Sequence, residues 1–148
     1  MPNEEQLAAN NPPNDTLLPW NMGYVNGDPN NHHNVRVLCD LCSLTEEQKN
    51  ILTACVRVES DFNTQITHSN YAYTLEGVKF VASTDFGIVQ INSYWNIGDG
   101  KPFPSSEYVL QNPEACVRFM CNYYKQNGNL VLWCSYTSGA YLKFLGKV

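Results

Sequence analysis

The chain has 148 residues, which is enough for one domain with a hydrophobic core of its own. Its net charge is −5 and it has no run of lysine or arginine, so nucleic acid is not an expected partner. No apolar stretch approaches the about 18 residues that a membrane helix needs, and the acidic first residues lack the apolar segment of a signal peptide. We expect a monomer without a membrane span, cofactor or metal.

The composition divides the chain into two parts. Residues 1–31 contain eight asparagines and five of the eight prolines, a composition typical of extended or disordered chain. We predict an extended or partly disordered arm over residues 1–31 and a folded domain over residues 32–148. The apolar exceptions are Leu17, Leu18, Trp20, Met22 and Tyr24, and we expect them to cover an edge of the core rather than to bind a partner.

The cysteines allow three interpretations. There are six of them, at Cys39, Cys42, Cys55, Cys116, Cys121 and Cys134. An even number in a small domain favours disulfides and an oxidising compartment. Free buried thiols are the first alternative. The second is a zinc site that joins the cysteines at 39 and 42 to His32 and His33, which we place in a loop.

Residues 45–60 carry the clearest helix signal. Thr45 and Gln48 form a capping box, and apolar residues at helical spacing continue to Glu59. We therefore predict a helix that ends close to Glu59. A carboxylate in that position faces the negative end of the helix dipole and apolar neighbours, which both raise its pKa. A raised pKa is what a general acid requires.

The middle of the chain changes to strand periodicity. Residues 71–75 and 78–81 flank Glu76 and Gly77, which predicts an antiparallel hairpin. Asp85 then stands at the entry to residues 88–91, which read as a third strand or as an apolar turn into the core. His68 precedes the hairpin, and we expect it in an exposed loop.

The last third of the chain predicts helices. Asn112 is the expected cap of a helix that has Pro113 in its first position and stops near Gly128. Residues 130–136 and 140–145 read as shorter helical pieces. The predicted fold class is α+β: mostly helical, with one small antiparallel sheet.

Two segments carry a resemblance to a known family. They are ESDFNTQ at residues 59–65 and STDFGIVQINSYW at residues 83–95. Together they resemble the active-site core of animal-type (c-type) lysozymes and of small bacterial and phage lytic transglycosylases. The resemblance covers about residues 43–145, and residues 136–139 are similar to a transglycosylase Tyr-Asn-x-Gly motif with Thr in place of Asn. It implies a lysozyme-like fold in which the sheet flanks an active-site cleft.

The resemblance implies roles for particular residues. Glu59 matches the catalytic acid, and Asp85 matches the second carboxylate, which acts as nucleophile or stabilises the oxocarbenium ion. Two such acids are what cleavage of a glycosidic bond requires. The implied substrate is the β-1,4 bond between N-acetylmuramic acid and N-acetylglucosamine in peptidoglycan. The implied substrate-binding residues are Gln90, Asn92, Trp95, Trp133 and Tyr136.

Three functions follow from these residues. The first is a muramidase that adds water across the bond. The second is a lytic transglycosylase, in which Glu59 is both acid and base and the C6 hydroxyl of the muramyl sugar attacks. The third is a lysozyme-like module that binds carbohydrate or serves a structural role. The chain departs from c-type lysozymes in a longer stretch between Glu59 and Asp85 and in lacking their eight cysteines. The missing cysteines argue against an animal origin. The lack of a signal peptide, the asparagine-rich arm and the Tyr-x-x-Gly ending suit a bacterial or phage enzyme, and we expect it to be extracellular, periplasmic or virion-associated.

Overall fold

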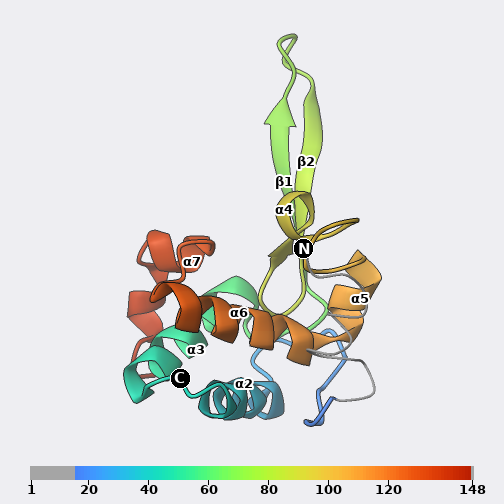
Figure 1. Cartoon of the computed structure of the whole chain (residues 1–148). Helices are drawn as coiled ribbons and strands as arrows, with labels where there is room; N and C mark the ends of the chain where they lie inside the picture. Colours follow the sequence, from blue (N-terminus) through green and yellow to red (C-terminus); the bar gives the residue numbers. More distant parts are fainter. Residues whose placement is uncertain (1–15, 148) are drawn as a thin grey trace.

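The computed structural model describes residues 16–147, and over that range the protein is an α+β fold. Six α-helices, one 3-10 helix and one three-stranded antiparallel sheet make up this part of the chain, which confirms the predicted fold class (Figure 1). The helices are α2 (Pro29–Leu41), α3 (Glu46–Ser60), α4 (Ser93–Asn96), α5 (Ser106–Gln111), α6 (Pro113–Asn127), α7 (Cys134–Thr137) and the 3-10 helix η2 (Ala140–Phe144). The strands are β1 (Thr67–Tyr73), β2 (Lys79–Phe86) and β3 (Ile91–Asn92).

Helix α2 corrects the predicted boundary after residue 31. It begins at Pro29, and the side chain of Asp28 caps it by accepting the N–H of Asn31. Asp28 followed by Pro29 is a typical start of a helix, but the many asparagines around these residues favoured an extended arm in the sequence. His32 and His33 therefore lie in a helix and not in a loop, and His32 stacks on Phe62 with ring centroids 4.6 Å apart.

Helix α3 begins as predicted. Thr45 accepts the N–H of Gln48, and the Gln48 side chain accepts the N–H of Thr45, which completes the capping box. The helix ends after Ser60, where Asp61 adopts a left-handed conformation and pairs with Arg57 at 2.6 Å. This end places Glu59 in the last turn of the helix.

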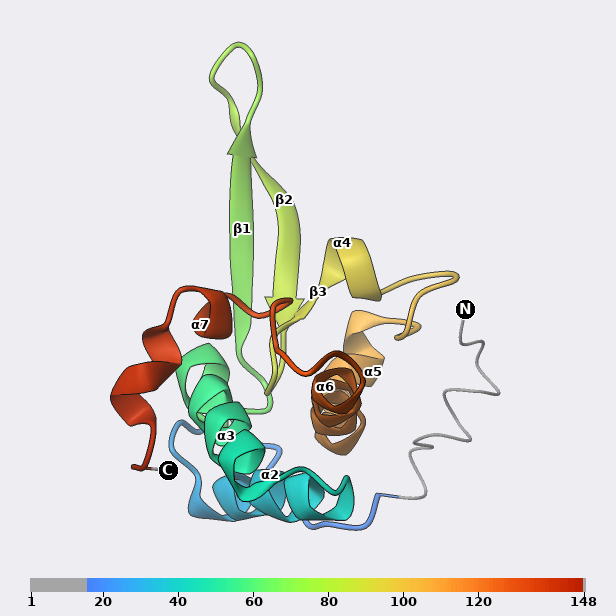
Figure 2. The same cartoon turned by 60° about the vertical axis from the view of Figure 1, so that its left-hand side comes forward.

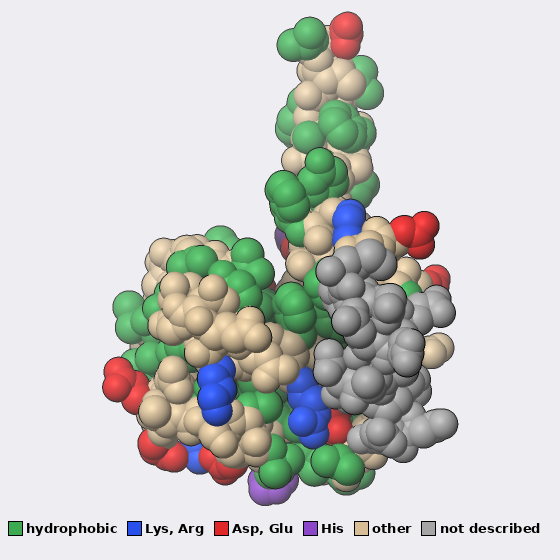
Figure 3. All heavy atoms as spheres, viewed as in Figure 1, with side chains coloured by type: hydrophobic (Ala, Val, Ile, Leu, Met, Phe, Trp, Pro, Cys, Tyr) green, Lys and Arg blue, Asp and Glu red, His purple; other side chains and the backbone are tan. Residues whose placement is uncertain are grey.

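The sheet is a long hairpin with a short third strand at its base. Strand order is β1-β2-β3, and the predicted turn at Gly77 connects β1 to β2. The hairpin projects away from the helices in both cartoon views (Figures 1 and 2). Its outer half is largely apolar and exposed, as the space-filling view shows (Figure 3). Strand β3 pairs only with the base of β2, so Asp85 lies where all three strands meet.

The core lies below the sheet, among α2, α3 and α6 (Figure 2). Helix α6 has Pro113 in its first turn and ends at Gly128 in a left-handed conformation, as predicted. Its predicted cap differs, because the side chain of Asn112 donates to the carbonyl of Tyr108 and makes no capping bond to α6. No helix among residues 16–147 is long and apolar enough to cross a membrane.

A buried carboxylate holds the segment that precedes α2. Glu114 is fully buried in the first turn of α6, and it accepts hydrogen bonds from the backbone N–H groups of Leu17 and Leu18 and from the indole of Trp20. Leu18 and Trp20 pack against the core, as expected, whereas Leu17, Met22 and Tyr24 are exposed, which corrects the expectation for these three. The part of the predicted arm at residues 1–15 lies outside the described residues.

The six cysteines are free thiols, which corrects the disulfides that their even number favours. The nearest approach is between Cys39 on α2 and Cys121 on α6, whose sulfur atoms lie 4.0 Å apart. Cys42 also contacts Cys121. A hydrogen bond between these two thiols, together with the positive charges of Arg118 and Lys125 nearby, lowers the pKa of Cys42 to about 7. No group of three or more metal-binding side chains is assembled among residues 16–147, so these histidines and cysteines do not form the alternative zinc site.

Candidate active site

Glu59 lies where the end of α3 meets α7 and the base of the sheet. Its Oε2 atom accepts the backbone N–H of Ser135, in the first turn of α7, at 3.1 Å. Ser60, the next residue, is buried and donates its hydroxyl to the carbonyl of Ile88. These two bonds fix the carboxylate between α7 and the turn that leads into β3.

The surroundings of Glu59 favour its protonated form. Burial raises the pKa of the Glu59 carboxyl above its usual range, and the negative charge of Asp85 raises it further. Hydrogen bonding from Ser135 and the positive charge of His68 oppose these effects without cancelling them. The two predicted carboxylates therefore lie within electrostatic range of each other.

Asp85 is held by amide groups from the strands on either side of it. Asn70 on β1 donates to Oδ2 at 3.0 Å, and Asn92 on β3 donates to Oδ1 at 2.9 Å. The hydroxyl of Ser83, two residues earlier on β2, accepts a second hydrogen bond from each of these amides at 3.1 Å. Each oxygen of the carboxylate therefore has a donor, and its orientation is fixed by all three strands.

The turn at residues 87–90 connects the two halves of the site. Ile88 and Val89 are fully buried, which identifies this segment as the apolar turn and Ile91–Asn92 as the strand. Gly87 has a φ of +77°, so a residue with a side chain would be strained here. The turn leads from β2 into β3, the strand that carries Asn92, and it is bonded to the end of α3 through the carbonyl of Ile88, which accepts the hydroxyl of Ser60.

Two predicted substrate-binding residues have structural partners instead. The amide nitrogen of Gln90 donates to the carbonyls of Ile66 and Gly87, so this side chain holds the turn. Asn92 orients Asp85 with its amide nitrogen and caps α4 with its oxygen, which accepts the N–H groups of Tyr94 and Trp95. Both side chains therefore shape the site.

The predicted aromatic residues fall into two environments. Trp95 on α4 is 72% exposed and beside β2, where a sugar ring could stack on it. Trp133 is only 5% exposed, donates its indole N–H to the carbonyl of Val89 at 2.7 Å, and packs as a core residue. Tyr136 on α7 is half-buried and stacks on Tyr141 with ring centroids 5.5 Å apart. Trp95 is thus the best placed of the three to contact a ligand.

Four contributors to the site were missed from the sequence: His68, Asn70, Ser83 and Ser135. His68 is exposed, as expected, but it lies in β1 and not in a loop. Asn70 bonds to Asp85 and to Ser83, and Ser135 contributes its backbone N–H to Glu59. No local sequence motif predicts such roles. Only the strand register and the long-range contact between α3 and α7 reveal them.

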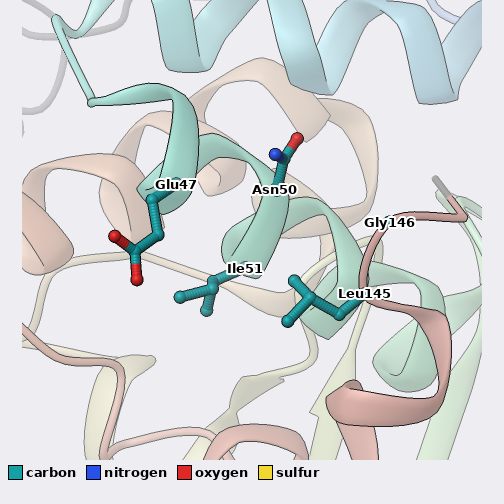
Figure 4. Close-up of a pocket in the computed structure, with 5 residues that line it drawn as sticks. All are labelled: Glu47, Asn50, Ile51, Leu145 and Gly146. Atoms are coloured by element: carbon teal, nitrogen blue, oxygen red, sulfur yellow. The ribbon is translucent and has the colours of Figure 1, made fainter.

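One surface depression is lined by none of the residues of the predicted site. It is lined by side chains from the first half of α3 and by the end of the chain, and Figure 4 shows Glu47, Asn50, Ile51, Leu145 and Gly146 around it. In the space-filling view, the surface is also hollowed between the lobe that carries α7 and the base of the hairpin (Figure 3).

Comparison with known proteins returns no match: neither a protein-family model nor a curated protein is similar to this sequence.

Proposed function

We propose that this protein is a peptidoglycan muramidase with a lysozyme-like fold, which hydrolyses the β-1,4 bond between N-acetylmuramic acid and N-acetylglucosamine. The observation that carries the proposal is the contrast between its two carboxylates. Burial keeps Glu59 protonated to higher pH, whereas Asp85 accepts a hydrogen bond on each oxygen. Two carboxyl groups in such different environments are the arrangement that glycosidases use for acid and stabiliser, with lysozyme as the standard example.

In the proposed reaction, Glu59 protonates the oxygen of the scissile bond while the bond to the anomeric carbon breaks. Asp85 faces the positive charge that develops on the sugar, and either forms a covalent bond to the anomeric carbon or stabilises the ion. Glu59, now ionised, takes a proton from water as the water adds to that carbon, and on the covalent route the bond from the carbon to Asp85 breaks in this step, which returns Asp85 to its carboxylate form. The donors on Asp85 hold its carboxylate in one orientation throughout, which avoids reorganisation during the reaction.

A lytic transglycosylase is the second candidate, because the same hydrogen bonds on Asp85 also suit a carboxylate that takes no part in the reaction. Asn70 and Asn92 each occupy one oxygen of the carboxylate, so Asp85 could serve as a fixed part of the cleft and not as a nucleophile. In that reaction, Glu59 would be the only acid and base, and the C6 hydroxyl of the muramyl sugar would replace water.

Mass spectrometry of the sugars released from purified peptidoglycan separates these possibilities. The muramidase proposal predicts products with free reducing ends, one water heavier than 1,6-anhydro products. Release of 1,6-anhydro sugars would replace it with the transglycosylase. Binding to peptidoglycan without release of any fragment would contradict both reactions and support a non-catalytic module.

A further inference from the structure

The outer part of the hairpin, residues 71–81, is exposed and largely apolar. Its exposed apolar side chains are Tyr71, Tyr73, Leu75, Val78, Phe80 and Val81. Tyr71 is opposite Val81, and the next residue, Ala72, is opposite Phe80, so these two pairs lie on opposite faces of the hairpin and make both faces apolar (Figure 3). A contiguous exposed apolar surface of this kind indicates a contact with a partner.

Strand β1 is also an unprotected edge of the sheet. It is the first strand in the order β1-β2-β3, so within residues 16–147 only β2 pairs with it (Figure 2). Proteins usually protect an edge strand with charged residues, proline or a bulge. Thr67–Tyr73 contains no lysine, arginine, aspartate, glutamate or proline, and the extra residue in the hairpin is Ala82 on β2. Strand β1 is therefore continuous and open to pairing with another strand.

The pairing within the hairpin shows which backbone groups of β1 are open. Thr74 donates its N–H to the carbonyl of Val78, so this pair is hydrogen-bonded. Hydrogen-bonded and non-hydrogen-bonded pairs alternate along an antiparallel ladder. The N–H and C=O groups of Tyr71 and Tyr73 therefore point away from β2. A strand can pair with these groups, whereas the apolar interior of a lipid bilayer cannot.

We propose that β1 pairs with β1 of a second copy of this chain, in an antiparallel register with Ala72 opposite Ala72 of the second copy. In this register Tyr71 is opposite Tyr73 of the second copy, and the reverse holds by symmetry. Their outward N–H and C=O groups then form four hydrogen bonds, and their rings form two cross-strand aromatic pairs. No charged residue of β1 opposes this pairing. The dimer replaces the monomer expected from the sequence, in which the edge position of β1 cannot be read.

The size of the contact indicates a weak dimer. A fully covered tyrosine buries about 150–250 Å². Tyr71 and Tyr73 are 54% and 65% exposed, so the four rings of two copies would bury about 400–600 Å². With the paired backbone, the interface remains at the low end of specific contacts, below about 1,200 Å². We expect an equilibrium between monomer and dimer with a dissociation constant of about 0.1 mM.

Sedimentation of the full-length protein, from about 10 μM to about 1 mM, tests the pairing and its register. Ala72→Lys places two lysines opposite each other, and Ala72→Glu places two glutamates there, so each variant alone should raise the dissociation constant at least about tenfold. An equimolar mixture of the two variants should dimerise at least as tightly as the wild type. Val131→Lys is the matched control, because it adds the same charge at an exposed apolar position between α6 and α7 and should leave the dimer unchanged.

Tyr73→Pro tests the backbone pairing separately. Because the N–H of Tyr73 points to the open edge, proline removes no hydrogen bond within the hairpin, and it removes two of the four between the copies. We expect this variant to raise the dissociation constant about tenfold. Circular dichroism checks that each variant is folded.

A wild-type protein that stays monomeric at about 1 mM would overturn the proposal. Binding of that monomer to phosphatidylcholine vesicles would then assign the apolar hairpin to a lipid surface. A dimer that neither Ala72→Lys nor Tyr73→Pro weakens would also overturn the proposal, and so would a mixture of Ala72→Lys and Ala72→Glu that dimerises no better than either variant alone. None of these measurements depends on cleavage of peptidoglycan.

Discussion

Replacing Glu114 tests how the segment before α2 is attached. Its carboxylate accepts three hydrogen bonds, from the backbone of Leu17 and Leu18 and from the indole of Trp20, and it lies 3.7 Å from Arg118. Glu114→Ala would leave three donors without their acceptor. Each unsatisfied donor costs about 1–3 kcal/mol when water cannot reach it.

We expect the total loss of stability in Glu114→Ala to be smaller than the sum of these three costs, for two reasons. Leu17 is 66% exposed, so its N–H can bind water, and removal of the carboxylate also removes the cost of burying a charge. We therefore expect Glu114→Ala to lower the free energy of unfolding by about 2–4 kcal/mol. Glu114→Gln keeps one acceptor oxygen, so its loss should be about 1–2 kcal/mol.

Urea denaturation followed by circular dichroism measures both losses. The control is Glu107→Ala, which removes an exposed carboxylate on α5 whose neighbour is the hydroxyl of Ser106. That change should stay within about 0.5 kcal/mol of the wild type. If Glu114→Ala were as stable as the control, or more stable than Glu114→Gln, then the three hydrogen bonds would not be what anchors this segment.

Three other predictions concern the site and the thiols. Asp85→Asn should reduce the release of reducing ends about a hundredfold by removing the charge opposite the developing cation, and an unchanged rate would assign Asp85 to the scaffold. Burial raises the pKa of Glu59 in the folded state, so ionisation of Glu59 costs stability increasingly as pH rises from about 4 through that pKa. Glu59→Gln should therefore be more stable than the wild type at pH 8 and equal to it below about pH 4, and a pH-independent difference between their urea midpoints would contradict this. Iodoacetamide at pH 7 should label Cys42 well before Cys55, because their pKa values are about 7 and about 12, and the reverse order by peptide mass spectrometry would refute this assignment.

The parts of the fold that were predicted correctly depend on neighbouring residues. The capping box at Thr45, the hairpin turn at Gly77 and the stop at Gly128 are each encoded within a few residues. Helix α2 was missed for the opposite reason. Its buried Asn31 and Asn34 are satisfied by the carbonyls of residues outside the helix, so their sequence looks like a polar linker.

The candidate site divides in the same way. Glu59 and Asp85 were found because each belongs to a long local motif. Asn70 and His68 were not, because their positions depend on the register of β1 against β2. Trp133 was expected to contact sugar, but the carbonyl of Val89 accepts its indole N–H and the core encloses it. Its sequence neighbourhood cannot show this contact, which joins residues 44 positions apart.

Glu59 is the proposed acid of a glycosidase, and the substitution Glu59→Gln, assayed on purified peptidoglycan, tests this role most directly. Release of reducing ends is measured for the wild type and the variant, with circular dichroism to show that both are folded. We expect the wild type to release reducing ends and the variant to release them about a hundred- to ten-thousandfold more slowly. A folded Glu59→Gln protein that cleaves at the wild-type rate would contradict it.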